Sequence, residues 1–246
     1  MKHTVEIDLL DVNKLLQGLT AMERIGWAVE TFGHDAVLLS SMQSSASVLM
    51  HSFYRMELDN EVIFVDTGYH FQETLQLRDE FMRRYKLNMV TLYPELTPEQ
   101  QEKKFEGKLY LSVDGQKECC RLRKTVPFIN HMMQYGRKLA MVGLRRSEGG
   151  RRAKLSPLIQ DPRTKGYTLH PLFDWTDEQI QAYLQKYDVP VHPLHRQNYP
   201  SIGCECCTTP VGPGEDPRAG RWRHLAALDD GEPKYCKINF SDGLGI

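Results

Sequence analysis

Five of the six cysteines in the chain lie in two short segments, at spacings that suit metal binding. KECCRLRK contains the adjacent Cys119 and Cys120, and YPSIGCECCTTPVGPG contains Cys204, Cys206 and Cys207. A C-x-x-C pair can give two thiolates to one metal centre, and adjacent thiolates can each bind a different iron of a cluster. The sequence therefore predicts a [4Fe–4S] cluster bound by Cys119, Cys120, Cys204 and Cys207. Cys206 is a substitute ligand or fills space, and the alternative for the whole set is buried packing cysteines.

The sixth cysteine, Cys236, stands apart in the lysine-flanked segment Lys234-Tyr235-Cys236-Lys237. Nearby lysines favour the thiolate and so lower the pKa of a thiol. An accessible thiolate between cations is a candidate nucleophile. The alternative is an incidental surface cysteine.

Cations lie close to the cysteine segments and at one predicted strand end. Arginine forks match phosphate and sulfate oxygens, so an anionic nucleotide would explain them, whereas solvated surface charges are the alternative. The serine-rich segment SSMQSSAS at 40–47 could cradle phosphate at a helix N-terminus, or be a simple turn. No Walker-type G-x-x-x-x-G-K-[ST] motif is present. The cations are Arg121, Arg123, Lys124, Arg145, Arg146, Arg218, Arg221 and Arg223.

The elements that must position these groups alternate between apolar strand-like runs and helical patterns. The runs lack period-2 alternation, which favours a parallel sheet covered on both faces, in an α/β fold. Such sheets bind ligands at the carboxyl ends of their strands, and polar groups follow three of the runs. The helix at 176–187 begins with Thr176 as N-cap and Gln179 at the capping-box position. We expect strands in 35–41, 61–71, 87–94 and 138–150, and helices in 8–33, 45–56, 72–85 and 176–187.

The bulk properties are those of an ordinary globular protein. The 246 residues carry a net charge of −1, so no global basic field favours a nucleic-acid partner. No apolar run reaches the roughly 18 residues of a membrane span, and the acidic start MKHTVEIDLLDV argues against a signal peptide. We therefore expect a cytoplasmic protein, in which clustered thiols indicate metal or catalysis rather than disulfides.

A change in composition near residue 189 predicts two parts within one structural unit. Residues 1–188 would form an α/β nucleotide-binding domain. Residues 189–246, rich in proline, glycine and cysteine, would form an irregular extension for the cluster and the substrate, with a mobile catalytic tail.

Taken together, these motifs resemble the assimilatory sulfonucleotide reductases, which comprise adenylyl-sulfate (APS) reductase and phosphoadenylyl-sulfate (PAPS) reductase, in their cluster-containing branch. The resemblance covers about 35 to 243 and implies an adenine nucleotide alpha-hydrolase-like fold with a mainly parallel sheet. It rests on VLLSSMQSSASVL, IFVDTGYHFQET, ECCRLRKTVPF, VGLRRSEG, HPLFDWTDEQIQAYL, YPSIGCECCTTPV, PRAGRW and KYCKINFSDG.

The resemblance also implies an activity and a role for each matched residue. APS would be reduced to sulfite and AMP through an S-sulfonate on Cys236, in sulfate assimilation and cysteine biosynthesis. Thioredoxin or glutaredoxin would resolve this intermediate, and a homo-oligomer is expected. The positions that match the family's cluster ligands are Cys119, Cys120, Cys204 and Cys207. Those that match its substrate-binding residues are Ser40, Ser41, Lys124, Arg145 or Arg146, Arg218 and Arg221.

The chain departs from the family pattern at three places. Around Cys236, Tyr235, Lys237 and Asn239 replace glutamate, glycine and histidine, and we hypothesise that Lys237 helps to keep Cys236 as thiolate. Cys206 stands where the family commonly has proline. The serine-rich loop lacks a glycine that is often found there.

Three other functions compete with APS reduction. A PAPS reductase would share the chemistry. A tRNA thiolase of the ATP-pyrophosphatase type would need an S-G-G-x-D-S loop, which residues 40–47 do not provide. A non-catalytic iron–sulfur protein would explain the cysteines and the altered tail, but not the arginines.

Overall fold

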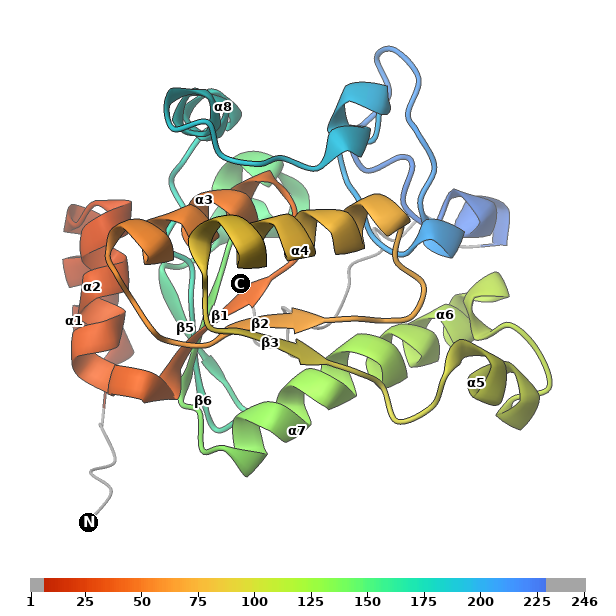
Figure 1. Cartoon of the computed structure of the whole chain (residues 1–246), viewed down its shortest axis with the longest axis horizontal. Helices are drawn as coiled ribbons and strands as arrows, with labels where there is room; N and C mark the ends of the chain where they lie inside the picture. The colour runs from red at the N-terminus through yellow and green to blue at the C-terminus, as the bar shows by residue number, and fades with distance from the viewer. Residues whose placement is uncertain (1–6, 229–246) are drawn as a thin grey trace.

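The computed structural model describes residues 7–228, in which helices cover both faces of a six-stranded sheet (Figure 1). The strand order is β3-β2-β1-β4-β6-β5, and all neighbours are parallel except β5 and β6. This confirms the predicted α/β fold with a mainly parallel sheet. The strands are β1 Ala36–Ser40, β2 Val62–Val65, β3 Met89–Leu92, β4 Leu139–Val142, β5 Leu158–Asp161 and β6 Gly166–Leu169.

The direction of the chain along the sheet reverses at β1. From β1 the chain proceeds through β2 to β3 on one side, and β4 then pairs with β1 on the other side. In open α/β sheets the crevice at the carboxyl ends of two such strands is the usual ligand site. The topology therefore predicts a ligand site at the residues that follow β1 and β4.

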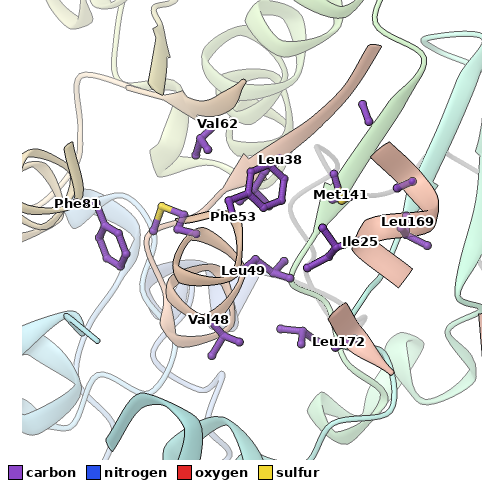
Figure 2. Close-up of a cluster of buried hydrophobic side chains, with 14 of the residues drawn as sticks. Ile25, Leu38, Val48, Leu49, Phe53, Val62, Phe81, Met141, Leu169 and Leu172 are labelled. Carbon is purple, nitrogen blue, oxygen red and sulfur yellow. The ribbon is translucent and has the colours of Figure 1, made fainter. Parts of the chain in front are cut away.

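Alternate strand residues point to opposite faces of the sheet and build two separate cores. Leu38, Val62 and Met141 pack with helices on one face, and Figure 2 shows them in one cluster with Ile25 and Leu49. On the other face, residues of the same strands pack against helix α7. The strands are thus buried on both sides, which explains why their sequences lack polar alternation.

Eight α-helices are present in the part of the chain that the structure describes. The predicted helix at 8–33 is in fact two helices, because Thr20 forms a capping box with Glu23 and starts a second one. The predicted capping box of Thr176 and Gln179 is confirmed. The helices are α1 Leu9–Gly18, α2 Ala21–Phe32, α3 Ser44–Arg55, α4 Gln72–Tyr85, α5 Pro98–Lys104, α6 Val113–Cys120, α7 Val126–Gln134 and α8 Asp177–Lys186.

A π-helical turn, Arg121–Thr125, joins α6 to α7 directly after the two adjacent cysteines. The Val126 amide donates to the Arg121 carbonyl, five residues back. Pro127 follows at once, and a proline has no amide hydrogen and collides with the carbonyl four residues before it. The wider turn accommodates this proline, and such turns are frequent at functional sites.

Residues 189–228 add short 3-10 turns but no α-helix or sheet strand to this frame. They include η7, Glu205–Cys207, and return to the sheet domain through an isolated bridge between His70 and Cys204. None of the helices in residues 7–228 is both long enough and apolar enough to span a bilayer.

Candidate active site

A cleft of about 1190 Å³ opens at the carboxyl ends of β1 and β4, and we call it the strand-end cleft. Its walls include Ser40 and Ser41 after β1, and Gly143, Leu144 and Arg145 after β4. Gly143 is required here, because a Cβ atom at this position would lie 2.9 Å from the Cβ of Ser45 on α3. The cleft also has five of the predicted cations in its walls, namely Lys124, Arg145, Arg218, Arg221 and Arg223.

The serine-rich loop turns sharply into α3 at one end of the strand-end cleft. Met42 has φ 55°, in the left-handed region that favours glycine. A glycine, which this loop lacks, would adopt the same conformation without strain. The Ser40 hydroxyl is buried against the sulfurs of Met42 and Met50, at 3.7 and 3.4 Å, whereas Ser41 is exposed. Helix α3 begins without a side-chain cap, so its first amides remain available to an anion.

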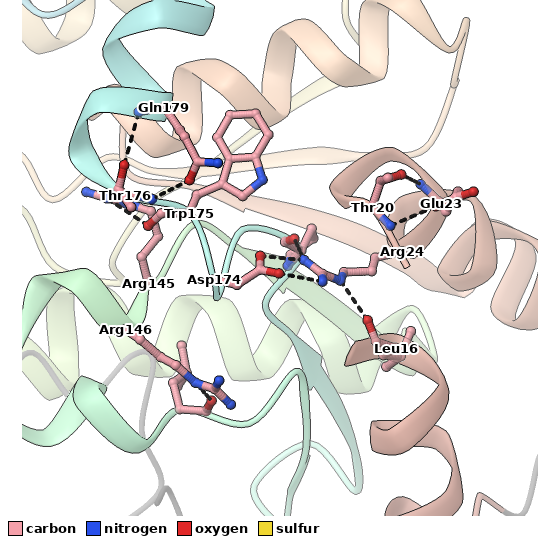
Figure 3. Close-up of polar contacts among 12 residues, drawn as sticks. Leu16, Thr20, Glu23, Arg24, Arg145, Arg146, Asp174, Trp175, Thr176 and Gln179 are labelled. Carbon is pink, nitrogen blue, oxygen red and sulfur yellow. Dashed lines mark hydrogen bonds and ion pairs between the residues drawn. The ribbon is translucent and has the colours of Figure 1, made fainter. Parts of the chain in front are cut away.

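The two arginines after β4 have different positions, which Figure 3 shows. Arg145 lines the strand-end cleft, and its guanidinium donates to the Ser45 hydroxyl at 2.9 Å and to the Asp177 carboxylate at 2.6 Å. Arg146 is not among the cleft-lining residues. Its Nε donates to the Leu155 carbonyl at 2.7 Å, and its guanidinium lies 4.6 Å from the centre of the Phe173 ring. Arg145 is therefore the one of the pair that the fold brings to the cleft.

Five cysteines, all free thiols, line a second and smaller cavity, which we call the thiol pocket. Cys119 and Cys120 occupy the last turn of α6, and Cys204, Cys206 and Cys207 lie in and beside η7. The two cysteine segments thus meet although more than 80 residues of sequence separate them. Within residues 7–228, no three histidine, cysteine or acidic side chains lie close enough together to hold a single metal ion.

Close contacts with two other segments fix the C-x-x-C loop. The Glu205 amide donates to the Tyr69 carbonyl at 2.8 Å, and the Trp222 amide donates to the Cys207 carbonyl at 2.9 Å. Gly203 permits the approach of Arg221, because a Cβ atom on Gly203 would lie 2.3 Å from a guanidinium nitrogen of Arg221. The loop is positioned by tertiary contacts rather than by a sheet.

Hydrogen-bond donors surround the sulfur atoms. The side-chain amide of Gln116 donates to Cys120 Sγ at 3.1 Å, and Thr67 Oγ1 lies 3.4 Å from Cys204 Sγ. Gln101 Nε2 donates to Cys119 Sγ at 3.6 Å. Such contacts orient sulfur ligands in metal sites.

The thiols differ in acidity. Burial raises the pKa of the Cys119 thiol to about 11. A hydrogen bond from the Cys206 thiol lowers the pKa of Cys207, and the nearby Lys124 and Arg221 cations lower it further. The same hydrogen bond and burial raise the pKa of Cys206. The cations therefore act on the thiol pocket as well as on the cleft.

Lys124 and Arg221 line both cavities. Lys124 comes from the π-helical turn that follows the adjacent cysteines, and Arg221 follows the C-x-x-C loop. Arg221 Nη1 donates to the Ile202 carbonyl at 3.2 Å, but its Nε is buried without a hydrogen-bond partner in the described structure.

The sequence did not predict two residues of the site, Ser201 and His70. Ser201 lies 3.4 Å from guanidinium nitrogens of both Arg218 and Arg221, and His70 lines the strand-end cleft. Ser201 lies three residues before Cys204, and this closeness to the C-x-x-C motif was the available signal. Arg123 was grouped with the anion-binding cations, but it is buried and donates to the carbonyls of Thr67 and Leu96.

The predicted nucleophile Cys236, with Lys237 and Asn239, lies outside the described residues.

Curated relatives cover most of this chain. An adenosine 5'-phosphosulfate reductase from Halalkalibacterium halodurans is 36% identical over 94% of this chain and 99% of its own length. The enzyme of the same name from Mycolicibacterium smegmatis is 39% identical over 88% of this chain and 89% of its own.

Among solved structures, the crystal structure of PAPS reductase from Candida auris in a phosphate complex matches with a TM-score of 0.74. It is 22% identical, over 84% of this chain and all of the other, which supports the same fold. The family model for the phosphoadenosine phosphosulfate reductase domain matches residues 35–210. That match includes the ends of β1 and β4 and all five cysteines of the thiol pocket, but it stops before Arg218 and Arg221. The chain therefore belongs to the phosphoadenosine phosphosulfate reductase domain family.

Proposed function

We propose that this chain is an oxidoreductase that converts adenylyl sulfate to sulfite and AMP in sulfate assimilation. The observation that carries the proposal is the position of Lys124 and Arg221 in the walls of both cavities. An anion bound in the strand-end cleft would lie against the same cations that face the thiols. The names of the relatives favour adenylyl sulfate over its 3'-phosphorylated form.

The thiol pocket fits a [4Fe–4S] cluster. Four thiolates are the ligand set that such a cluster needs, and the pocket provides Cys119, Cys120, Cys204 and Cys207 without a disulfide among them. When bound, the cluster would supply charge and fixed positioning next to Lys124 and Arg221.

Substrate binding follows from the residues of the strand-end cleft. The uncapped start of α3 and the Ser41 hydroxyl would bind phosphate oxygens, and Lys124, Arg218 and Arg221 would bind the phosphosulfate. These cations offset the repulsion between an anionic substrate and an attacking thiolate.

The chemistry assigned to Cys236 has two steps. Its thiolate attacks the sulfate sulfur, the bond to the phosphate oxygen breaks, and AMP leaves. A thiolate of a reduced dithiol protein then attacks Cys236 Sγ, and sulfite leaves with the bonding electrons. The second thiol of that protein resolves the mixed disulfide, so the dithiol supplies both electrons.

The proposal also covers the electron donor, the compartment and the oligomeric state. The donor would be thioredoxin or glutaredoxin, the compartment the cytoplasm, and the assembly a homo-oligomer. Adenylyl sulfate, rather than a nucleic acid or a membrane, is the partner that the cleft chemistry favours.

Sulfite release from adenylyl sulfate, with a reduced dithiol protein, tests the proposal. We expect turnover by the wild type and none by Cys236→Ser, with much slower turnover of the 3'-phosphorylated substrate. Equal activity of Cys236→Ser would overturn the assigned nucleophile. Faster turnover of the 3'-phosphorylated substrate would make the chain a PAPS reductase.

A further inference from the structure

The fifth thiol of the thiol pocket, Cys206, has no role in the four-ligand set. It is half-buried, lines the pocket, and its Sγ lies 3.7 Å from Cys207 Sγ. Both residues belong to the short helix η7, so one rigid turn holds the two sulfur atoms.

The distance between these two sulfur atoms matches the distance between two thiolate ligands of one metal ion. Two thiolates bound to one tetrahedral metal, at about 2.3 Å each, lie roughly 3.8 Å apart. The 3.7 Å between Cys206 and Cys207 is close to this value. An iron held by Cys207 on the side that faces Cys206 would therefore be within reach of both sulfur atoms.

The other three thiols of the ligand set have different neighbours. Gln101, Gln116 and Thr67 contact the sulfur atoms of Cys119, Cys120 and Cys204. These side chains can orient a sulfur ligand but cannot replace it as a thiolate. At Cys207, by contrast, the contact is a second thiol.

We propose that Cys206 is a reserve ligand for the iron that Cys207 binds. This inference rests on the proposed cluster. In the exchange, Cys206 would hold the iron as a thiolate in place of Cys207, and the proton that Cys206 loses would be balanced by one that Cys207 gains. The oxidation state of the iron does not change. The exchange would retain the cluster whenever Cys207 is released or modified.

Iron content after anaerobic reconstitution tests the proposal. We expect about four irons per chain in the wild type, in Cys206→Ser and in Cys207→Ser. The double variant Cys206→Ser/Cys207→Ser and the single variant Cys204→Ser should lose most of this iron. Alkylation followed by peptide mass spectrometry gives a second readout: Cys206 should react in the wild type and be protected in Cys207→Ser.

The outcomes distinguish a failure of the proposed reserve ligand from a failure of the proposed cluster. An iron-loaded wild type with a Cys207→Ser variant as depleted as the double variant overturns the reserve ligand alone. An iron-free wild type overturns the proposed cluster, and the reserve ligand with it.

A kinetic measurement keeps the test valid if Cys207→Ser does not fold. We expect a chelator to remove iron from Cys206→Ser about 10-fold faster than from the wild type, because a released iron can no longer be recaptured. Equal rates of iron removal would contradict the proposal.

Discussion

The strand-end cleft and the thiol pocket share two cations but are built in different ways. Parallel strands β1 and β4 hold the cleft through a hydrogen-bonded ladder. The C-x-x-C side of the pocket depends instead on a few tertiary contacts, from Tyr69, Trp222 and Arg221. A ladder distributes its hydrogen bonds over many residues, so single substitutions in the loop should do more harm than single substitutions around the cleft. The following variants test this difference.

Gly203→Ala should have the largest effect. The new Cβ would lie 2.3 Å from the Arg221 guanidinium, so this cation must leave the wall shared by both cavities. We expect sulfite formation to fall by about 1000-fold or more, with a loss of bound iron, because both the cation and the thiol pocket are disturbed. Gly18→Ala is the control, since a Cβ there meets no atom within 4 Å. Full activity and full iron content in Gly203→Ala would contradict the role of this close approach.

Lys124→Ala should affect the chemistry but not the iron. Removal of one preorganised charge at a reacting anion costs about 100- to 1000-fold in kcat. We expect this loss of sulfite formation with an unchanged iron content per chain. Lys117→Ala, which removes an exposed lysine paired with Asp114, serves as the control. A parallel loss of iron would mean that Lys124 supports the thiol pocket rather than the substrate.

Gln116→Leu should have a smaller effect, confined to the pocket. The substitution removes the 3.1 Å hydrogen bond to Cys120 Sγ. We expect a chelator to remove iron roughly 10-fold faster, because partners of metal ligands contribute about this much to affinity. Gln134→Leu, on an exposed position of α7, is the matched control. Identical rates of iron release in both variants would exclude a role for Gln116.

His170→Asn should change stability with pH and leave the activity of the folded enzyme near that of the wild type. Burial lowers the pKa of His170 to about 4, against 6.5 for an ordinary histidine. The unfolded chain therefore binds a proton that the folded chain excludes, and stability is lost as the pH falls from 6.5 towards 4. This histidine accounts for up to about 3 kcal/mol of that loss. Denaturant unfolding at several pH values should show a shallower loss in the variant, and an identical slope would contradict the assignment.

The parts of the fold that the sequence predicted correctly have strong local signals. The runs of β1, β2 and β4 are continuous, mostly apolar and buried, and the run of β3 is half-buried. Thr176 with Gln179 satisfies a local capping rule. The hairpin of β5 and β6 was missed because its segments, LIQD and GYTL, are short and partly polar. Helices α5 to α7 were also missed, since glycine, proline and charged residues interrupt their helical patterns.

The candidate site was predictable in its residue types but not in their contacts. Cysteine spacing was sufficient to group the two segments that form the thiol pocket. No local pattern distinguishes Arg145 from Arg146, because tertiary contacts with Asp177 and Phe173 decide which one reaches the cleft. The shared position of Lys124 and Arg221 depends in the same way on how two distant segments pack.

The most direct test of the central claim, that both cavities serve one sulfur transfer, is a mass spectrum of the protein after incubation with adenylyl sulfate alone. The account predicts one added SO₃ group on the peptide that contains Cys236, in much smaller amount in Lys124→Ala. The absence of any adduct, or an adduct on a cysteine of the thiol pocket instead, would contradict it.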